Sequence, residues 1–449
     1  MLFLRKILWI GILLCGTWGS GAPFEEGAKV CFLGDSITHG GTFHYTIYNY
    51  YVTRFPDRKV AFFNAGVSGD SAGGALGRLE EDVFSRNPDV VVFMFGMNDV
   101  GRGNYVVNPS EQQLASQKRS LEGYRGNMKT LVNRVVEQLQ PQLIFITPSP
   151  FDDTGENDRN NNQPGCNGAL EKCAAMVWEL AEATNGKVVD FHAPMTALNE
   201  RQQKENPRFT IVGPDRVHPQ APGHLMMAWL FLKAQDVPAL VSDVAIDGAK
   251  REVTRCENAE ISDFQVKNGE ISFQLREKSL PFPIDPAATS VLDLIPVVED
   301  LNQQKLRVSG LPEAVYELWV DGNVVGKYRR EELEQGINLA MNPAMPSYQQ
   351  AQKVRELSLQ RMATERLLRD YAASRWFLRR KVNPDDLVAV QVFYDSLSHK
   401  TGYYESRIPK YLSGWPQREA VVEKLAQEDA VVRAAAVPVK HAYVLKAVP

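Results

Sequence analysis

The chain has 449 residues, of which 44% are hydrophobic and 23% charged, and this predicts a large globular core divided over two or three domains. Lysine and arginine number 50 against 54 aspartate and glutamate, a net charge of −4, so a general polyanion binder such as a nucleic-acid-binding protein is not expected. The sequence shows no zinc-type cluster of cysteine and histidine, and neither a metal nor another cofactor is predicted.

Residues 1–22 have the pattern of a signal peptide. Arg5 and Lys6 precede a short apolar run over 7–18, and small residues follow it, as signal peptidase requires. The pattern predicts an exported protein, periplasmic or secreted, with no stable membrane insertion after cleavage. Two alternatives stay open, because the segment could be an uncleaved anchor and Cys15 could be a lipid attachment site.

Between residues 28 and 240 short apolar strands alternate with helices. Five runs predict strands, over 28–35, 59–67, 89–96, 142–148 and 186–191, and helices are predicted over 42–55, 71–86, 111–139, 169–184 and 224–235. The third strand is almost wholly apolar, as expected for a parallel strand that is buried on both faces. This rhythm predicts a three-layer α/β domain over 28–240 with a central parallel sheet and right-handed crossovers.

The pattern changes after residue 243. Alternating segments around an Asn-Gly turn at 268–269 and an Asp-Gly turn at 321–322 predict two hairpins, and with them a small β-rich accessory domain over 245–335. The remainder is charge-rich and helical in pattern, so a helical C-terminal region is expected over 336–449.

Polar clusters follow the first three predicted strands and precede the last helix of the α/β domain. Ser36 follows the first strand, Gly69 the second and Asn98 the third, while Asp215 and His218 lie in the loop before the last helix. Because ligands bind at the carboxyl ends of the strands of an open parallel sheet, these residues are expected to converge there. A serine, a histidine base and a carboxylate that orients it are the machinery of acyl transfer, which also needs donors for an oxyanion.

Each residue of this constellation is assigned a role. Ser36 is the expected nucleophile, His218 the base that takes its proton, and Asp215 the carboxylate that holds the histidine. The backbone N–H groups of Ser36 and Gly69 and the side chain of Asn98 are expected to form the oxyanion hole.

The four clusters, GDSIT, NAGVSGD, GMND and DRVH, resemble the four sequence blocks of the SGNH (GDSL-type) hydrolase family and come in the family order over roughly residues 28–235. The resemblance implies a flavodoxin-like three-layer α/β/α sandwich, to which this chain adds a β-rich and then a helical C-terminal extension. It also implies a serine esterase without a metal, since the members are esterases, lipases and carbohydrate acetylesterases. Asp35, beside the nucleophile, and Asp99, which is expected to brace its loop, are the supporting residues.

A second serine competes for the role of nucleophile. Ser71 lies in a literal G-x-S-x-G over 69–73, the pattern of the nucleophile elbow of α/β-hydrolases, and His-Gly-Gly at 39–41 looks like the start of their oxyanion loop. Only two predicted strands precede Ser71, however, and this assignment leaves the cluster around Asn98 without a role. Ser36 is therefore the expected nucleophile.

The sequence thus predicts an exported esterase that acts through an acyl-serine intermediate and removes O-acetyl groups from carbohydrates. Its expected partner is a small-molecule or glycan ester, and the sequence predicts no oligomeric state. Two alternatives remain: a lipase or acyl-thioesterase of the same family, and a non-catalytic glycan-binding protein.

Two further groups allow more than one interpretation. Cys166 and Cys173 could form a disulfide if Cys166 lies in the loop before the predicted helix, whereas on one helix they would lie too far apart. The loop that carries Asp152, Asp153, Glu156 and Asp158 could bind calcium, although it lacks the spacing of an EF-hand loop, and a solvated loop is favoured.

Aromatic and histidine side chains outside the constellation are also ambiguous. Tyr394, Tyr403 and Tyr404 could stack on sugar rings or simply pack. The remaining histidines are expected at the surface or packed, and either of the first two could line the pocket: His39, His44, His192, His224, His399 and His441.

Overall fold

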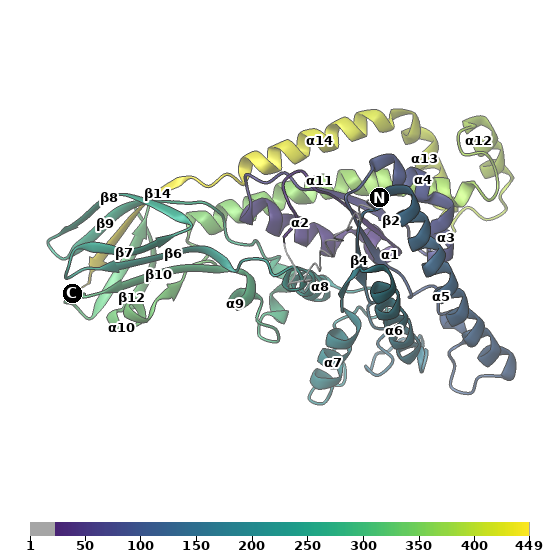
Figure 1. Ribbon diagram of the computed structural model, residues 1–449, viewed down its shortest axis with the longest axis horizontal. Coiled ribbons are helices and arrows are strands. Elements are labelled where there is room, and N and C mark those ends of the chain that lie inside the picture. The colour runs from purple at the N-terminus through teal and green to yellow at the C-terminus, as the bar shows by residue number, and fades with distance from the viewer. Residues whose placement is uncertain (1–22, 449) are drawn as a thin grey trace, which may run out of the picture.

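The computed structural model describes residues 23–448, so the predicted signal peptide and Cys15 lie outside the described residues. Figure 1 shows an α/β body on one side and a strand-rich body on the other, joined along one edge by two long helices. Among residues 23–448, the helices include none with the length and apolar character needed to cross a membrane.

A five-stranded parallel sheet forms the centre of the α/β body. Its strands are β1 (Lys29–Gly34), β2 (Ala61–Gly66), β3 (Val90–Met94), β4 (Gln142–Ile146) and β5 (Lys187–Val189), in the spatial order β2-β1-β3-β4-β5. This order is that of a flavodoxin-like doubly wound sheet, so the predicted fold class is confirmed. The order reverses between β1 and β3, and the crevice for a ligand is expected at that point.

Alternate residues of β1 face two different cores, as the pleat of a strand requires. Val30 and Phe32 lie in the layer of α2 (Thr42–Arg54) and α8 (Ala221–Ala234), whereas Cys31 and Leu33 face α5 (Glu111–Leu139) and α6 (Cys166–Thr184). Shorter helices lie between these elements: α1 (Ser36–Gly40), α3 (Ala72–Ala75), α4 (Leu79–Asp82) and α7 (His192–Gln203). Helices thus cover both faces of the sheet and form the three layers.

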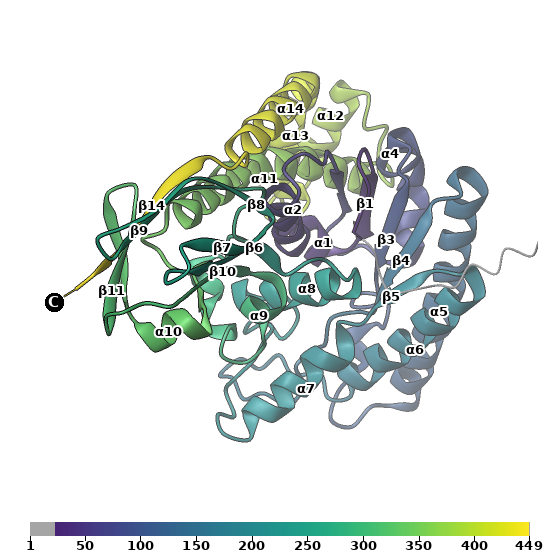
Figure 2. The same ribbon diagram turned by 60° about the vertical axis from the view of Figure 1, so that its left-hand side comes forward.

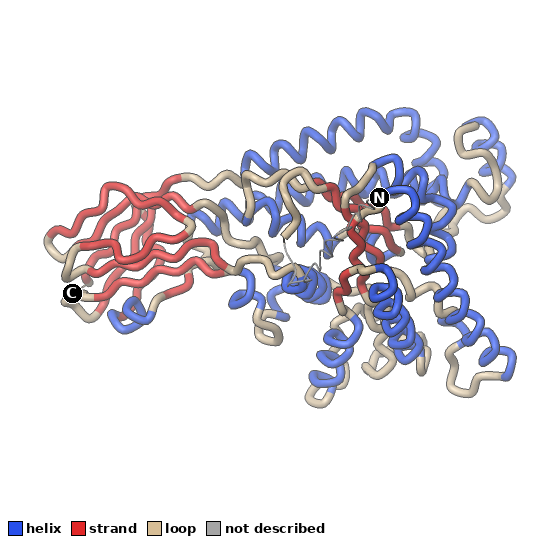
Figure 3. Tube along the Cα trace, in the orientation of Figure 1, coloured by secondary structure: helices blue, strands red, loops and turns tan. Residues whose placement is uncertain are grey.

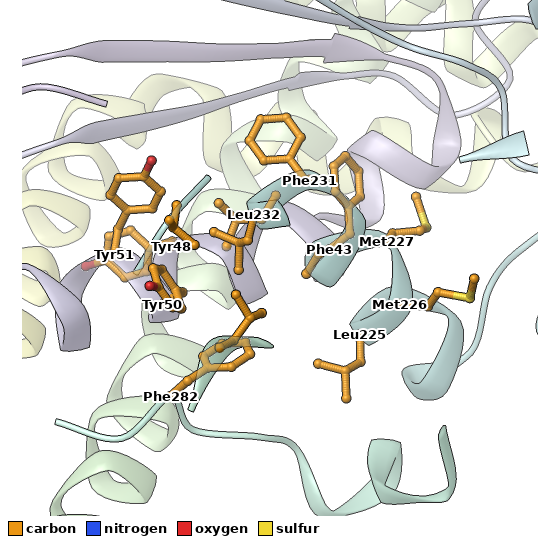
Figure 4. Packing of buried hydrophobic residues seen from close by; sticks show 14 of the residues in the cluster. Phe43, Tyr48, Tyr50, Tyr51, Leu225, Met226, Met227, Phe231, Leu232 and Phe282 are labelled. Carbon is orange, nitrogen blue, oxygen red and sulfur yellow. The ribbon is translucent and has the colours of Figure 1, made fainter. Parts of the chain in front are cut away.

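The first of these cores reaches beyond the α/β body. Figure 4 shows tyrosines of α2 packed with leucine and phenylalanine side chains of α8 and with Phe282, which comes from the C-terminal half of the chain. The rings of Phe282 and Tyr50 lie 5.5 Å apart edge to face. The 3₁₀ turn Pro286–Val291 and α9 (Val297–Leu301) also pack against α8. Residues 280–301 therefore pack in the core of the α/β body, within the range 245–335 over which a small β-rich accessory domain is predicted.

The strand-rich body is a sandwich of two sheets around one core. One sheet has the order β13-β10-β6-β7 and the other the order β12-β11-β14-β9-β8, and Figure 3 shows them well apart from the parallel sheet. The strands are β6 (Leu240–Asp247), β7 (Glu252–Glu257), β8 (Ala259–Lys267), β9 (Glu270–Glu277), β10 (Gln303–Ser309), β11 (Val315–Val320), β12 (Asn323–Arg329), β13 (Ile337–Asn338) and β14 (Lys440–Ala447), with α10 (Arg330–Gln335) before β13.

The last strand, β14, differs from the expected helical end of the chain. It lies between β9 and β11, in the middle of its sheet, and Tyr443 and Leu445 point into the sandwich core. Its burial alternates along KHAYVLKA, which is the period of a strand with one buried face.

The C-terminal region has four helices, α11 (Pro346–Leu378), α12 (Leu387–Ser396), α13 (Ile408–Gly414) and α14 (Arg418–Ala435), of which α11 and α14 link the two bodies (Figure 1). In Figures 1 and 2, α11 leaves the sandwich and crosses the α/β body beside α2, and α14 runs back along α11. The chain therefore passes repeatedly between the two bodies, and α11 brings C-terminal residues to the edge of the parallel sheet.

Candidate active site

Three loops at the carboxyl ends of neighbouring strands carry the predicted nucleophile and oxyanion-hole residues. Ser36 begins α1, directly after β1, and the Asp35 carboxylate caps this helix by accepting the Ile37 N–H at 3.0 Å. Gly69 follows β2, and Asn98 follows β3. The strand order places these loops side by side at the switch point of the sheet.

Ser36, His218 and Asp215 form a continuous chain of short hydrogen bonds. The Ser36 Oγ lies 2.7 Å from His218 Nε2, and His218 Nδ1 lies 2.6 Å from Asp215 Oδ2. The other carboxylate oxygen of Asp215 accepts the backbone N–H groups of Val217 and His218 at 3.1 and 3.0 Å. Partial burial alone would raise the pKa of Asp215, but the bonds from His218 and the two N–H groups lower it. The carboxylate is therefore ionised and aimed at Nδ1.

Hydrogen bonds of Arg216 fix the loop that carries Asp215 and His218. The buried Arg216 guanidinium donates to the carbonyl oxygens of Asp152 and Gly155 at 2.6 and 2.8 Å, and its backbone has a φ of +67°. A bridge between Val212 and Pro219 closes the loop. These bonds point the neighbouring Asp215 and His218 toward the crevice.

Residues 66–69, which we call the oxyanion loop after the role predicted for Gly69, depend on glycine at both ends. A Cβ at Gly66 would lie 2.1 Å from the His39 backbone nitrogen, so only glycine lets α1 pack against the end of β2. Gly69 has a φ of +71°, which other residues adopt at a cost. The Asn98 side chain donates one N–H to the Asp70 carbonyl at 2.8 Å, and its second amide hydrogen remains for a ligand.

Asp99 ties the loop after β3 to the start of α3. One carboxylate oxygen accepts the Ala72 N–H at 3.0 Å and the other accepts the Gly96 N–H at 3.1 Å. Burial raises the pKa of Asp99 to about 7 despite these bonds, and burial likewise raises the pKa of Asp35 to about 6. Both carboxyl groups lie next to the site, and neither belongs to the Ser36–His218–Asp215 chain.

Ser68, within the oxyanion loop, is held by a histidine that sequence reasoning assigned no partner. The His39 Nδ1 accepts the Ser68 N–H at 3.1 Å, while its Nε2 lies 3.4 Å from the carboxylate of Asp370 on α11. Burial lowers the pKa of His39, so the ring is neutral with its proton on Nε2. His39 therefore braces the loop from beneath and does not line the cavity.

Two tyrosines of the C-terminal region hold Ser68 from the other side. The Tyr403 hydroxyl donates to Ser68 Oγ at 2.8 Å, and the Tyr404 hydroxyl donates to the Ser68 carbonyl oxygen. Tyr404 stacks on Phe377 of α11 at 5.1 Å, whereas Tyr403 is 48% exposed. Tyr404 thus packs against α11, and Tyr403 is the tyrosine whose ring is exposed near the site. Tyr394 is not part of the cavity wall.

A cavity of about 610 Å³ opens over the Ser36–His218–Asp215 chain. Its wall combines both halves of the protein: Ser36, Ile37, Gly40, Thr42, Ser68, Gly69, Asn98, Arg102, His218, Pro219, His224, Arg366, Tyr403 and Tyr404. Sequence reasoning missed Arg102, Arg366 and the wall position of His224. Arg102 lies four residues after Asn98 and could have been suspected, whereas nothing in the sequence connects Arg366 with residues 300 positions earlier.

Ser71 has a structural role. Its hydroxyl caps α3 by accepting the Gly74 N–H at 3.2 Å, and it is not part of the cavity wall. The preceding Asp70 is buried and forms an ion pair with Arg78 at 2.7 Å. The G-x-S-x-G pattern therefore forms the start of a short helix here.

The two groups left open by the sequence are also placed. Cys166 and Cys173 are both free, buried and on α6, so the disulfide is not formed. In the acidic loop the carboxylates bind nitrogen donors: Asp152 binds Gly155 and Gln203, Asp153 binds Gly165, and Asp158 binds Arg208. Within residues 23–448, no three histidine, cysteine, aspartate or glutamate side chains are arranged to hold a metal ion.

An open parallel sheet that carries a hydrogen-bonded Ser–His–Asp chain at its switch point has the geometry of the serine hydrolases. The model of the GDSL-like lipase/acylhydrolase family matches residues 32–226. Residues 32–226 therefore match the GDSL-type (SGNH) hydrolases, and this match supports a hydrolase that acts on esters.

Three similar proteins extend this comparison. An acetylxylan esterase of Geobacillus stearothermophilus is 29% identical over 223 residues, which are 46% of this chain and 94% of the relative. The solved structure of BT4096, described as a gut microbial diltiazem-metabolizing enzyme, is 29% identical with a TM-score of 0.89 and covers 96% of this chain and 99% of its own. The structure of the acetylxylan esterase Axe2 from Geobacillus stearothermophilus, 26% identical, covers 48% of this chain and 96% of its own with a TM-score of 0.38. The likeness to BT4096 extends over the sandwich and the C-terminal helices.

Proposed function

We propose that the chain is an exported serine esterase that hydrolyses esters through an acyl-Ser36 intermediate and removes O-acetyl groups from carbohydrates. The observation that carries the proposal is the pair of hydrogen bonds, 2.7 and 2.6 Å long, that join Ser36 to His218 and His218 to Asp215 at the cavity wall. This is the arrangement that makes a serine hydroxyl a nucleophile at neutral pH.

The reaction follows from these positions. His218 Nε2 takes the Ser36 proton as Oγ attacks the ester carbonyl, and the ionised Asp215 stabilises the imidazolium that forms. The N–H groups of Ser36 and Gly69 and the free amide hydrogen of Asn98 are the donors available to the tetrahedral oxyanion. His218 then protonates the departing alcohol, and a water molecule, activated by the same imidazole, releases the acid from Ser36.

The cavity wall supports a short acyl group and a polar leaving group. Aliphatic side chains of the wall are few, Ile37 and Pro219, and most other wall side chains carry a hydroxyl, amide, imidazole or guanidinium group. A long acyl chain would need a continuous apolar groove. The acetylxylan esterase named above supports an enzyme for acetyl esters. Export is supported by the signal-peptide pattern of residues 1–22.

Nitrophenyl esters of increasing chain length and a panel of acetylated glycans test the proposal. We expect hydrolysis of the acetate and propionate esters, a steep fall from the octanoate onward, and release of acetate from at least one glycan. We also expect covalent labelling of Ser36 by a fluorophosphonate probe. A preference for long chains would indicate the lipase alternative, and failure of both labelling and turnover would indicate a glycan-binding protein.

A further inference from the structure

Two arginines in the cavity wall point to the substrate that this site takes. We propose, on the basis of the function proposed above, that the acetylated sugar carries a carboxylate, as a uronic acid does, and that Arg102 and Arg366 bind it. The charged side chains of the wall are arginines, with no aspartate or glutamate among the lining residues. A chain with a net charge of −4 therefore presents a cationic cavity around its nucleophile.

The guanidinium groups of Arg102 and Arg366 have no hydrogen-bond partner among the described residues. Within the described residues, the side chains of Arg102 and Arg366 form no hydrogen bond and no ion pair, whereas Arg369, one turn further along α11 from Arg366, binds four times through its guanidinium. A guanidinium offers five donors in a planar fork that fits the two oxygens of a carboxylate. The two side chains are free to make such bonds to a ligand.

The backbone positions of both arginines are fixed. Arg102 begins a 3₁₀ turn after Gly101, whose φ of +68° and close approach to Ser120 favour glycine. The Asn104 carbonyl oxygen at the end of this turn accepts a hydrogen bond from Gln117 on α5 at 2.8 Å. Arg366 lies on α11 next to Glu365, which accepts the N–H of Asn64 on β2. The two cations therefore come from well-anchored elements of different halves of the protein.

Within the described residues, no neighbouring carboxylate forms an ion pair with these cations, although the charge of Arg102 acts on Asp35. Asp370 is shared between His39 and Lys410, with bonds of 3.4 and 3.0 Å. Asp215 is bound to His218, and Asp70 to Arg78. Burial lowers the pKa of His224 to about 3, so this wall residue adds no charge of its own. The positive charge of the cavity is available to a ligand.

The test compares three sugars that differ at a single carbon. An O-acetylated methyl galacturonoside carries a carboxylate at C6, its methyl ester removes the charge, and the corresponding galactoside has a hydroxymethyl group. We expect kcat/KM for the uronate to exceed that for both neutral sugars at least tenfold, since charge-assisted hydrogen bonds to a guanidinium are roughly twice as strong as neutral ones. We expect added salt to reduce this ratio.

Arg102→Met and Arg366→Met connect the preference to these residues. Each variant is expected to lower the ratio of uronate to galactoside about tenfold, the effect of about 1.4 kcal/mol of lost binding. The ratio is insensitive to a general loss of folded enzyme, because both substrates would suffer equally. Arg119→Met, on the exposed face of α5, is the matched control and should keep the wild-type ratio.

Three results would overturn the inference: equal rates on the uronate and the galactoside, a preference that survives in both variants, or a stronger preference for a galactoside 6-sulfate than for the uronate. In each of these cases turnover of nitrophenyl acetate that depends on Ser36 would leave the proposed function standing. Absence of that turnover would instead contradict the proposed function itself.

Discussion

Arg369 is the most informative position at which to test how the C-terminal helices support the site. Its buried guanidinium donates to both carboxylate oxygens of Asp82, at 2.8 and 3.1 Å, and twice to the Gly66 carbonyl oxygen, at 3.2 and 3.0 Å. Gly66 opens the oxyanion loop, so this side chain fastens α11 to the end of β2. The change to make is Arg369→Met, which keeps an unbranched apolar stem and removes the guanidinium with its charge.

The contacts of Arg369 set the expected magnitude. Breaking a buried ion pair by removing one partner costs about 3–5 kcal/mol, because the remaining charge is left uncompensated. Asp82 keeps Arg78 at 2.7 Å, which favours the lower end of this range, but the Gly66 carbonyl loses both donors. The Arg369 charge also holds the pKa of the buried Asp82 well below its usual range against the effect of burial. We expect a loss of about 3 kcal/mol of unfolding free energy.

Urea unfolding followed by tryptophan fluorescence measures this loss, since Trp376 lies on the same helix. The matched control is Lys353→Met, also on α11, because Lys353 and Glu356 form an ion pair while 62% and 59% exposed. This control should change the first unfolding transition by less than about 1 kcal/mol. A loss in Arg369→Met no larger than that of the control would refute the reasoning. We also expect Arg369→Met to lower kcat, because the oxyanion loop loses its anchor.

Further predictions concern the carboxyl group beside the nucleophile, the loop and the thiols. Burial raises the pKa of Asp35 from 3.8 to about 6, so this carboxylate becomes protonated as the pH falls through 6. The negative charge that favours the imidazolium form of His218 is then lost. The wild type should therefore lose activity in that window by a step that Asp35→Asn lacks. Because the pKa of Asp35 is raised on folding, the unfolding free energy of the wild type relative to Asp35→Asn should fall as the pH rises from about 4 to 6. Urea titrations that show the opposite slope would contradict the raised pKa of Asp35. Tyr404→Phe removes the hydroxyl that holds Ser68 and should lower kcat about two- to tenfold with little change in KM, the effect of one neutral hydrogen bond, whereas Tyr394→Phe should have none. An aromatic disulfide reagent should react with the exposed Cys256 in the folded protein and, only after unfolding, with the buried Cys31, Cys166 and Cys173, since burial raises the pKa of Cys31 and Cys166 to about 12. Two thiols missing from the unfolded, unreduced protein would instead indicate a disulfide.

The parallel sheet and the meeting of Ser36, His218 and Asp215 could be predicted because local patterns encode them. Each strand is an apolar run that ends in a turn, and the rule that ligands bind at the carboxyl ends of parallel strands brings the polar clusters together. The roles assigned to these residues stay predictions until they are mutated. The place of Ser71 follows from the same reasoning, since a serine before Ala-Gly-Gly is a common cap of a helix.

The contribution of the C-terminal region could not be predicted in this way. The bond between Asp82 and Arg369 joins residues 287 positions apart, and the bond between Ser68 and Tyr403 joins residues 335 positions apart. A charged residue on an amphipathic helix is usually solvated, so nothing in the sequence marks Arg366 or Arg369 as part of a site. The insertion of β14 between β9 and β11 was missed for a related reason, because pairing of the last strand with two distant strands leaves no local signal beyond its short alternation.

The central claim is that Ser36 and not Ser71 is the nucleophile, and the hydrolysis of nitrophenyl acetate by Ser36→Ala and Ser71→Ala measures it most directly. We predict that Ser36→Ala loses at least about 10⁴-fold in kcat, as expected when the nucleophile of such a triad is removed. Ser71→Ala should keep most of its activity and lose only about 1 kcal/mol of stability with its helix cap. Full activity in Ser36→Ala together with an inactive but folded Ser71→Ala would contradict the account.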